Sequence, residues 1–363
     1  MSGSRILLAA GGTGGHMFPA EALAGELLKR GYAVDLVTDR RGQAFGDRLG
    51  QVGVHRVHAA GVIGRSFGKK LAALALLALG TLQARLLVGR LRPRVVIGFG
   101  GYASVPAMLA ASQAGCATLL HEQNAVLGRA NKLLAPRSRA IATSFPETGS
   151  VRETDRAKLV HTGNPVRPAV IGVANQPYPS LGQGVRLLVT GGSQGARIFA
   201  DVVPAAIASL PKDMRQRLFV SQQCRPEDLD RVARTYDEAE VKADLAAFFS
   251  DLPRRLGGAH LAICRAGAST VAELTVAGVP AILVPLASAD DHQTENARFV
   301  ERAGGGWVVE QKDFSAPTLA RRLFGLVRDT AALESAAAAA RAVGIPDAAT
   351  RLADLVQRLG TAA

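Results

Sequence analysis

A pattern of apolar strand, glycine-rich turn and helix occurs twice in this chain of 363 residues, and it limits the fold more than any other feature. RILLAA (5–10) is followed by GGTGGH, and VRLLVT (185–190) is followed by GGSQGA. Continuous apolar strands separated by helices are typical of a parallel sheet that is covered on both faces. We therefore predict an α/β fold of two doubly wound, Rossmann-like domains, with ligands bound in a cleft at the carboxyl ends of the strands.

The same alternation continues along the chain and indicates the domain boundaries. An N-terminal domain is expected at residues 1–168, a linker at 169–184 and a C-terminal domain at 185–363, whose last helices could pack back on the N-terminal domain. The linker is predicted where proline, glycine and polar residues replace the apolar runs. The predicted strands lie at residues 5–10, 33–38, 54–59, 94–100, 117–124, 139–144, 185–190, 217–222, 260–264 and 281–286, and the predicted helices include 18–30, 69–92 and 197–210.

Positive charge is concentrated in the first half of the chain. Residues 1–168 contain 22 Lys and Arg against 9 Asp and Glu, whereas residues 169–363 contain 21 of each. Such asymmetry predicts an anionic partner, which could be an acidic membrane surface, a phosphorylated substrate or a nucleic acid, although solvated surface charge would give the same pattern. Nucleic acid is disfavoured, because aromatic residues make up only 5% of the chain and no nucleic-acid-binding motif occurs.

One apolar segment approaches the length of a membrane span. Residues 71–89 read LAALALLALGTLQARLLVG, but Gly80, Gln83 and Arg85 interrupt the run. A span needs about 20 predominantly apolar residues, so we predict an interfacial or core helix instead. Leucines at spacings of three and four, together with basic residues throughout 62–94, favour contact with anionic headgroups. Packing of the whole apolar stripe against the sheet is the alternative.

Two glycine loops and a polar strand end are expected at one edge of the N-terminal sheet. GGTGGH (11–16) follows the first strand, GFGGYASVP (98–106) follows the fourth, and HEQN (121–124) ends the fifth. Glycine lets the backbone approach a ligand, and a helix N-terminus after such a loop favours an anion. His16, at the tip of the first loop, is a candidate general base, and Glu122 is a second acid–base candidate. Each motif alone is also typical of ordinary loops and helix caps.

The C-terminal domain carries a matching set of motifs. GGSQGA (191–196) repeats the glycine turn, with Ser193 as a candidate ligand hydroxyl. CRAGASTVAEL (264–274) places small residues at a helix start, where backbone N–H groups could cradle a diphosphate beside Arg265. Glu273, one turn into that helix, is a candidate for accepting two ribose hydroxyls, although a capped helix with an exposed Glu would have the same sequence.

Two further motifs supply basic and polar side chains. GNPVR (163–167) precedes the predicted linker, and its Arg167 is expected to hold a phosphate or to position a sugar. DDHQTENA (290–297) follows an apolar strand, and we expect its polar residues, His292, Gln293 and Asn296, to line the same cleft.

Seven motifs in this order resemble the MurG family of bacterial glycosyltransferases. They are GGTGGHMFPA, GFGGYASVPA, HEQN, GNPVR, GGSQGAR, CRAGASTVAEL and DDHQTENA, and the match extends from about Ile6 to Ala297. These enzymes are undecaprenyldiphospho-muramoylpentapeptide β-N-acetylglucosaminyltransferases with the GT-B fold, whose C-terminal domain holds most of the donor nucleotide. The resemblance implies transfer of N-acetylglucosamine from UDP-N-acetylglucosamine to the muramoyl O4 of lipid I, with inversion, forming lipid II and UDP.

The resemblance also implies site residues at the matching positions of these motifs. Donor contacts are implied at Thr13, Gly14, Gly15, Asn124, Arg167, Ser193, Phe249, Ala268, Ser269, Thr270, Val271, Ala272, Glu273 and Gln293. Phe249 stands where relatives often have Ile, and it is expected to contact the uracil mainly through its backbone. Acceptor contacts are implied at Gly100, Gly101 and Tyr102. His16 is the favoured base, and Glu122 is the other candidate.

No metal ion or other cofactor is expected. The three cysteines lie far apart, and no CxxC or Cys/His cluster occurs, which disfavours a disulfide framework and a structural zinc site. Asp228-Leu229-Asp230 matches the DxD pattern of metal-dependent glycosyltransferases, but we interpret it as a helix start on a solvated face. Positive charge and backbone N–H groups would then stabilise the leaving diphosphate in place of a metal.

The implied partners are UDP-N-acetylglucosamine, lipid I, the anionic cytoplasmic face of the cell membrane, and proteins of cell-wall synthesis and division. Two alternatives are other enzymes of the same fold, either a glycosyltransferase for another lipid acceptor or a UDP-N-acetylglucosamine epimerase. A third is a membrane scaffold that binds a sugar nucleotide without catalysis, but the presence of both His16 and Glu122 argues against it. A nicotinamide dehydrogenase is disfavoured because the GxGxxG spacing is missing.

Overall fold

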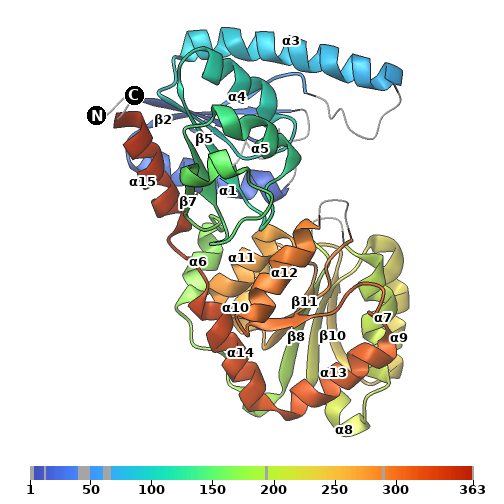
Figure 1. The fold of residues 1–363 in the computed structure, drawn as a ribbon. Helices are drawn as coiled ribbons and strands as arrows, with labels where there is room; N and C mark the ends of the chain where they lie inside the picture. The colour runs from blue at the N-terminus through green and yellow to red at the C-terminus, as the bar shows by residue number, and fades with distance from the viewer. Residues whose placement is uncertain are drawn as a thin grey trace. The chain divides into compact units, whose positions relative to one another are not determined.

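A computed structural model divides the chain into two compact units (Figure 1). Met1–Arg167 with Asp347–Ala363 form the N-terminal unit, and Pro168–Pro346 form the C-terminal unit. Each unit contains a parallel sheet with helices on both faces, so the predicted α/β class with two doubly wound sheets is confirmed. The structure describes residues 4–11, 14–39, 50–59, 67–192, 195–287 and 291–361.

The described part of the N-terminal unit has a seven-stranded sheet in the order β3-β2-β1-β4-β5-β6-β7. The strand order reverses between β1 and β4, which is the point where open α/β sheets bind their ligands. Its strands are β1 (Arg5–Ala9), β2 (Ala33–Thr38), β3 (Gly53–Arg56), β4 (Val95–Gly98), β5 (Ala117–Glu122), β6 (Ala140–Thr143) and β7 (Leu159–His161). Its helices are α1 (Gly14–Lys29), α3 (Phe67–Leu91), α4 (Ser104–Gln113), α5 (Arg129–Leu134) and α15 (Ala348–Thr361).

The last helix of the chain belongs to the N-terminal unit. α15 packs beside α1 (Figure 1), where Leu352 and Val356 join the same buried apolar cluster as Leu23. An ion pair of 2.7 Å between the Arg30 and Asp354 side chains links the two helices at the surface. Of the last helices, α15 thus packs back on the N-terminal unit, whereas α13 (Ala316–Arg328) and α14 (Thr330–Ala342) stay with the C-terminal unit.

The described part of the C-terminal unit has a six-stranded sheet in the order β10-β9-β8-β11-β12-β13. The order reverses between β8 and β11, which again marks a ligand-binding edge. Its strands are β8 (Val185–Thr190), β9 (Leu218–Gln223), β10 (Lys242–Ala246), β11 (Leu261–Cys264), β12 (Ala281–Leu283) and β13 (Gly306–Val308). Besides α13 and α14, its helices are α6 (Pro168–Ala174), α7 (Arg197–Ala208), α8 (Lys212–Arg215), α9 (Leu229–Glu238), α10 (Leu252–Gly258), α11 (Ala268–Ala277) and α12 (His292–Arg302).

Several predicted element boundaries differ from the structure, and two of the differences change an interpretation. The first helix begins at Gly14 rather than at residue 18, so His16 lies in a helical first turn and not at a loop tip. The sequence favours a loop at these residues because glycine is a poor helix former. The N–H groups of a first helical turn need no intrahelical partner, so glycine is tolerated there. The predicted linker, 169–184, opens with α6, because its valines, Val170 and Val173, are buried among α10 and α11.

Helix α3 is apolar on more than one side. On one side, Ala84, Leu87 and Val88 are buried against the rest of the N-terminal unit. The helix packs mainly against α4. The chain after β3 contacts α3 at Gly80, where a side chain would leave no room: a Cβ there would overlap the His58 carbonyl oxygen. Gln83 Oε1 then accepts from the His58 backbone N–H at 3.1 Å. These residues, which interrupt the apolar run in the sequence, therefore dock the helix. Within the described residues, no helix is long and apolar enough to cross a membrane.

Candidate active site

Strand register brings three motifs to one edge of the N-terminal sheet. Ala9 of β1 pairs with Gly98 of β4, which in turn pairs with Leu120 of β5. The chain leaves all three strands at the same level, so the residues that follow them gather at this edge, as the sequence predicts. The motifs concerned are GGTGGH, GFGGYASVP and HEQN.

The two glycine loops pack backbone against backbone at this edge. A Cβ on Gly101 would lie 3.4 Å from the Cα atom of Gly11, and Gly101 has a φ of 72°. Gly100 has a φ of 86°, and a Cβ there would lie 3.2 Å from Cδ2 and Nε2 of His16. Glycine is therefore required for both the conformation and the space. The His16 imidazole lies against the Gly100 backbone and is partly exposed.

Glu122 is buried and accepts four hydrogen bonds. Its side chain is at the end of β5, and the residue is 2% exposed. Oε1 accepts from the backbone N–H of Asn124 at 3.0 Å and from its amide at 3.2 Å. Oε2 accepts from the Gly128 N–H and from Asn131 Nδ2, both at 2.8 Å. Both carboxylate oxygens are therefore occupied by donors from the chain between residues 124 and 131.

His121 is fully buried beside this carboxylate. The Gln123 amide donates to Nδ1 at 2.9 Å, which leaves Nε2–H to donate to the Gly163 carbonyl oxygen at 3.2 Å. Burial is the main reason that the pKa of His121 is lowered to about 4, and the nearby His16 contributes in the same direction. His121 is therefore neutral at pH 7, with both ring nitrogens engaged, whereas His16 is the imidazole at the accessible side of the edge.

Two buried asparagines at this edge were not predicted as site residues. Asn131 donates through Nδ2 to the His121 carbonyl oxygen and to Glu122, while its Oδ1 has no partner among the described residues. Asn164, in the GNPVR motif, is 5% exposed, and neither of its amide atoms has a partner among them. The sequence signal that could have identified Asn131 is an asparagine on the same side of the short helix α5 as the apolar Ala130 and Leu134.

The other predicted residues of the N-terminal unit lie around this edge. Gly14 and Gly15 are in the first turn of α1, and Tyr102 follows Gly101 and is partly exposed. Asn124 is held by Glu122, as described above. The Arg167 guanidinium carbon lies 5.4 Å from the centre of the Phe18 ring of α1, which places Arg167 near the first turn of that helix. Thr13 lies outside the described residues.

The C-terminal sheet repeats this arrangement. Cys264 of β11 pairs with Thr190 of β8 and with Leu283 of β12, so the segments after these strands share one edge. Gly192 and Gly195 have φ values of 81° and 67°. A Cβ on Gly191 would lie 2.2 Å from the Ala196 nitrogen, so this turn requires glycine. Ser193, inside the turn, lies outside the described residues.

Helix α11 begins at this edge, as predicted for CRAGASTVAEL. Gly267 is its N-cap residue, and Ala268, Ser269 and Thr270 form the first turn, whose N–H groups are available to an anion. Val271 and Ala272 follow, and Glu273 is 7% exposed, so the exposed-Glu interpretation is wrong. Ser269 Oγ is buried without a partner among the described residues.

Arg265 is a half-buried cation beside that helix start. Its Nη1 donates to the Val284 carbonyl oxygen at 3.1 Å, and its guanidinium carbon lies 5.4 Å from the centre of the Phe199 ring. In the part of the chain that the structure describes, no carboxylate is within ion-pair distance of Arg265. Burial lowers the pKa of Arg265 from its ordinary value, which is the expected effect on a cation that lacks a counter-charge.

The remaining predicted residues line the same edge. Gln293 Oε1 accepts from the Leu286 N–H at 3.0 Å, and the buried Asn296 donates to the Ala266 carbonyl oxygen at 3.0 Å. His292 opens α12, next to these side chains. Phe249 is 6% exposed and follows the end of β10.

The two aspartates of the DxD sequence lie at the start of helix α9 in the C-terminal unit. Asp228 ends a 3₁₀ turn and Asp230 is in the first turn of α9, so the predicted helix start is confirmed. The predicted solvated face is wrong for Asp228, which is 5% exposed and pairs with Arg231 at 2.8 Å. Among the described residues, no group of three His, Cys, Asp or Glu side chains is arranged to hold a metal ion.

Comparison with known proteins identifies relatives over nearly the full length. The UDP-N-acetylglucosamine--N-acetylmuramyl-(pentapeptide) pyrophosphoryl-undecaprenol N-acetylglucosamine transferase of Rhodospirillum centenum is 57% identical over 98% of this chain and 94% of its own length. The transferase of the same name from Zymomonas mobilis is 48% identical over 99% of this chain and 94% of its own length.

Solved structures agree with the fold. The crystal structure of Acinetobacter baumannii MurG aligns with a TM-score of 0.79 and 28% identity over 98% of this chain and 99% of that chain. A kitacinnamycin glycosyltransferase aligns with a TM-score of 0.74, and its 17% identity over 99% of this chain and all of its own supports the GT-B fold alone.

Models of protein families cover both units. Residues 6–143 match the glycosyltransferase family 28 N-terminal domain, and residues 186–356 match the glycosyltransferase family 28 C-terminal domain. The resemblance to MurG transferases is confirmed, and the chain belongs to glycosyltransferase family 28.

Proposed function

We propose that this chain transfers N-acetylglucosamine from UDP-N-acetylglucosamine to the muramoyl O4 of lipid I, with inversion, and releases lipid II and UDP. The proposal is carried by the sequence identity of 57% and 48%, over nearly the full length, to transferases that are named for this reaction. The enzyme is a hexosyltransferase, and each unit has a reversal of strand order, which is where open α/β sheets bind their ligands. The cleft that the sequence predicts between the domains stays a prediction.

The acceptor half of the reaction is assigned to the N-terminal edge. In the proposed step, His16 takes the proton of the muramoyl C4 hydroxyl while that oxygen attacks C1 of the donor sugar. The bond from C1 to the diphosphate oxygen breaks, and UDP leaves with the electron pair. Gly100 and Gly101 are proposed to contact the acceptor because they border the His16 ring, and Tyr102 because it follows them in the same loop. Glu122, with four donors on its carboxylate, is proposed to hold Asn124 and Asn131 in place rather than to act as the base.

The donor half is assigned to the C-terminal edge. Arg265 and the first-turn N–H groups of α11 are proposed to stabilise the negative charge that develops on the leaving diphosphate. Glu273 is proposed to accept the ribose hydroxyls, and Phe249 and Gln293 to contact the base and the sugar. Gly14, Gly15, Asn124 and Arg167 of the N-terminal unit, together with Thr13 and Ser193, remain proposed donor contacts.

The donor assignment predicts that Glu273→Ala weakens UDP binding by about 10- to 100-fold, since a lost charge-assisted hydrogen-bonding contact costs about 1.5–3 kcal/mol. Calorimetric titration with UDP measures this. Glu295→Ala is the control, because Glu295 is on the adjacent helix α12 and pairs with Arg298 at 2.8 Å. Equal UDP affinity of Glu273→Ala and the wild-type protein would place the ribose elsewhere.

The reaction itself is tested by radiolabelled transfer from UDP-N-acetylglucosamine to a lipid I analogue. Formation of the labelled disaccharide lipid with release of UDP is the expected result, and the same assay in EDTA reports any need for a divalent ion. Absence of transfer to this acceptor, combined with transfer to another lipid, would point to a different glycosyltransferase. Conversion of the donor alone would point to an epimerase.

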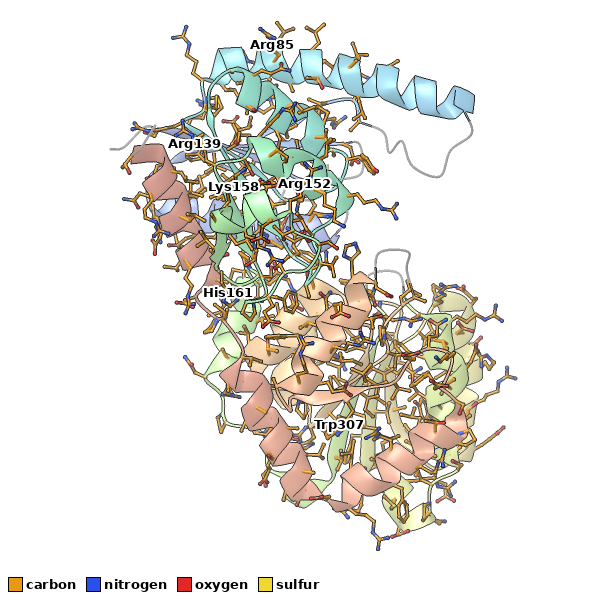
Figure 2. The ribbon with its side chains drawn as sticks, in the orientation of Figure 1. Arg85, Arg139, Arg152, Lys158, His161 and Trp307 are labelled. Atoms are coloured by element: carbon orange, nitrogen blue, oxygen red, sulfur yellow. The ribbon has the colours of Figure 1, made fainter. Side chains whose placement is uncertain are left out.

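We further propose that the protein acts as a peripheral protein on the cytoplasmic face of the cell membrane, because the acceptor is a lipid. Helix α3 supports this with leucines that the unit leaves exposed: Leu76, Leu79, Leu82 and Leu86. Their spacings of three and four residues place them on one side of the helix, away from the buried Ala84 and Val88. Arg85, labelled on α3 in Figure 2, and Arg90 are exposed beside them.

Membrane binding predicts that changing Leu82 and Leu86 together to Gln weakens co-sedimentation with phosphatidylglycerol vesicles by about 100-fold or more, because each buried leucine contributes about 1.5–3 kcal/mol. These two leucines are 58% and 71% exposed, so the change leaves the core intact. Phe324→Gln, on α13 of the C-terminal unit, is the control. Unchanged sedimentation of the double variant would place the membrane face elsewhere. Arg65 lies outside the described residues, as do the side chains of Lys69 and Lys70, which the sequence also assigned to this face.

A further inference from the structure

A cluster of charged residues in the C-terminal unit is built around Arg255, next to the ring of Phe249. Arg255 of α10 lies with its guanidinium carbon 4.0 Å from the centre of that ring. Its Nε donates to Asp251 at 2.8 Å, and its Nη1 donates to Asp244 at 2.6 Å and to Ser221 at 3.0 Å. The Arg255 side chain is 19% exposed, so one guanidinium joins three chain segments from a largely buried position.

Strand register explains why these partners meet. Asp244 of β10 pairs with Ser221 of β9, so both side chains point to the same face of the sheet. Asp251 is the residue before α10, and Arg255 is one helical turn later, on the side that faces these strands. A planar guanidinium has donors in a fixed fork and a flat face for an aromatic ring, which suits it to hold two carboxylates and stack on a phenyl group at once.

The segment that Arg255 covers ends at the ligand-binding edge. The chain from 247 to 249 follows β10, and the Gln223 amide donates to the Ala247 carbonyl oxygen at 3.1 Å. Gln223 in turn accepts from the Thr190 hydroxyl at 2.9 Å, next to the glycine turn after β8. This end of the segment is therefore bound to the edge through Gln223, and the other end is bound through Asp251, Arg255 and the Phe249 ring.

We infer that Arg255 is a positioning residue for the base of the donor nucleotide, acting through Phe249. The inference rests on the proposed function, in which the Phe249 backbone contacts the base. Arg255 does not contact the substrates itself. Arg255 stacks on the Phe249 ring and is itself held by Asp244 and Asp251. The position of the ring, and with it that of the Phe249 backbone, is set in this way. Because the base is remote from the bond that breaks, Arg255 contributes to donor binding and little to the chemical step.

The test is UDP binding by Arg255→Ala, measured by calorimetry, together with the kinetics of transfer. The Kd for UDP and the KM for the donor are expected to rise by about 10- to 100-fold while kcat stays within about 3-fold, since only binding remote from the reacting atoms is lost. Arg255→Lys keeps the charge but loses the fork and the flat face, so we expect it to recover only part of the affinity.

Arg254→Ala is the matched control. Arg254 is the adjacent residue and pairs with the same carboxylate, Asp251, at 2.8 Å, but its side chain is 83% exposed. Its removal is expected to leave the Kd for UDP within about 2-fold of wild type, since an exposed ion pair contributes little. Equal losses in Arg254→Ala and Arg255→Ala would show a general effect of charge and would overturn the inference.

A double-mutant cycle tests the route through the ring. Phe249→Leu removes the aromatic face and keeps an apolar side chain, so Arg255→Ala should cost little further affinity in that background. Additive losses would show that Arg255 acts by another route. The inference also fails if Arg255→Ala binds UDP like wild type while Glu273→Ala binds it weakly. Wild-type affinity in both variants would instead contradict the proposed donor site as a whole.

Discussion

Replacing His16 by alanine is expected to lower kcat by about 100- to 10,000-fold, the usual contribution of a positioned general base. The Kd for UDP should stay within about 2-fold, because the proposed contacts to the diphosphate and ribose belong to the C-terminal unit. The effect is attributed to His16 and not to the neighbouring His121, because His121 is buried with both ring nitrogens hydrogen-bonded. Single-turnover transfer to a lipid I analogue, with saturating donor, measures the change.

His55→Ala is the control for the loss of an imidazole from the same unit. His55 is on β3 and pairs with Asp35 at 2.7 Å, so its removal should leave kcat nearly unchanged. If His16→Ala retains kcat within a few-fold of wild type, the proton is taken by another group. Glu122 would then return as the candidate base, and its variants would show the loss instead.

Replacing Glu122 by alanine is expected to lower the free energy of unfolding of the N-terminal unit by about 3–5 kcal/mol. The change removes the acceptor of four hydrogen bonds and leaves the N–H groups of Asn124, Gly128 and Asn131 without it. Urea unfolding followed by circular dichroism measures the effect. Glu147→Ala, an exposed carboxylate in the same unit, should change the stability by less than about 0.5 kcal/mol.

Glu122→Gln separates a structural carboxylate from a catalytic one. Glutamine keeps the shape of the side chain and one acceptor oxygen, but its NH₂ group would face hydrogen-bond donors in place of the second oxygen. The free energy of unfolding should therefore fall, but by less than in Glu122→Ala. The folded variant should keep kcat within about 10-fold of wild type. Wild-type stability combined with a loss of 100-fold or more in kcat would make Glu122 the base and contradict its assignment as a structural residue.

Most strands of both sheets can be predicted from the sequence because each is an apolar run between breakers. β2 and β8 were predicted residue for residue. β7, β10 and β13 were not, since each lies at the edge of its sheet, and β7 and β13 have only three residues each. Such strands are stabilised by pairing with a neighbour rather than by their own side chains, so their sequences carry little signal.

The candidate site divides in the same way. Strand-end motifs predict which residues gather at each edge, because parallel strands leave a sheet at one side, and His16, Glu122, Arg265 and the α11 start all follow from that rule. The difference between His16 and Glu122 does not follow from it. It depends on donors at 124, 128 and 131 that reach one carboxylate only when the chain after β5 folds back.

The sequence by itself determined the fold class, the family and the two edges, because these depend on local periodicity and on glycine positions that no other residue can fill. Only the tertiary structure decided which side of α3 is exposed, since that helix is apolar nearly all round and packing alone selects the buried face. The same is true of Arg255, whose partners at 221, at 244 and at 249 and 251 belong to three chain segments. A side chain that joins distant segments has no spacing to mark it in the sequence.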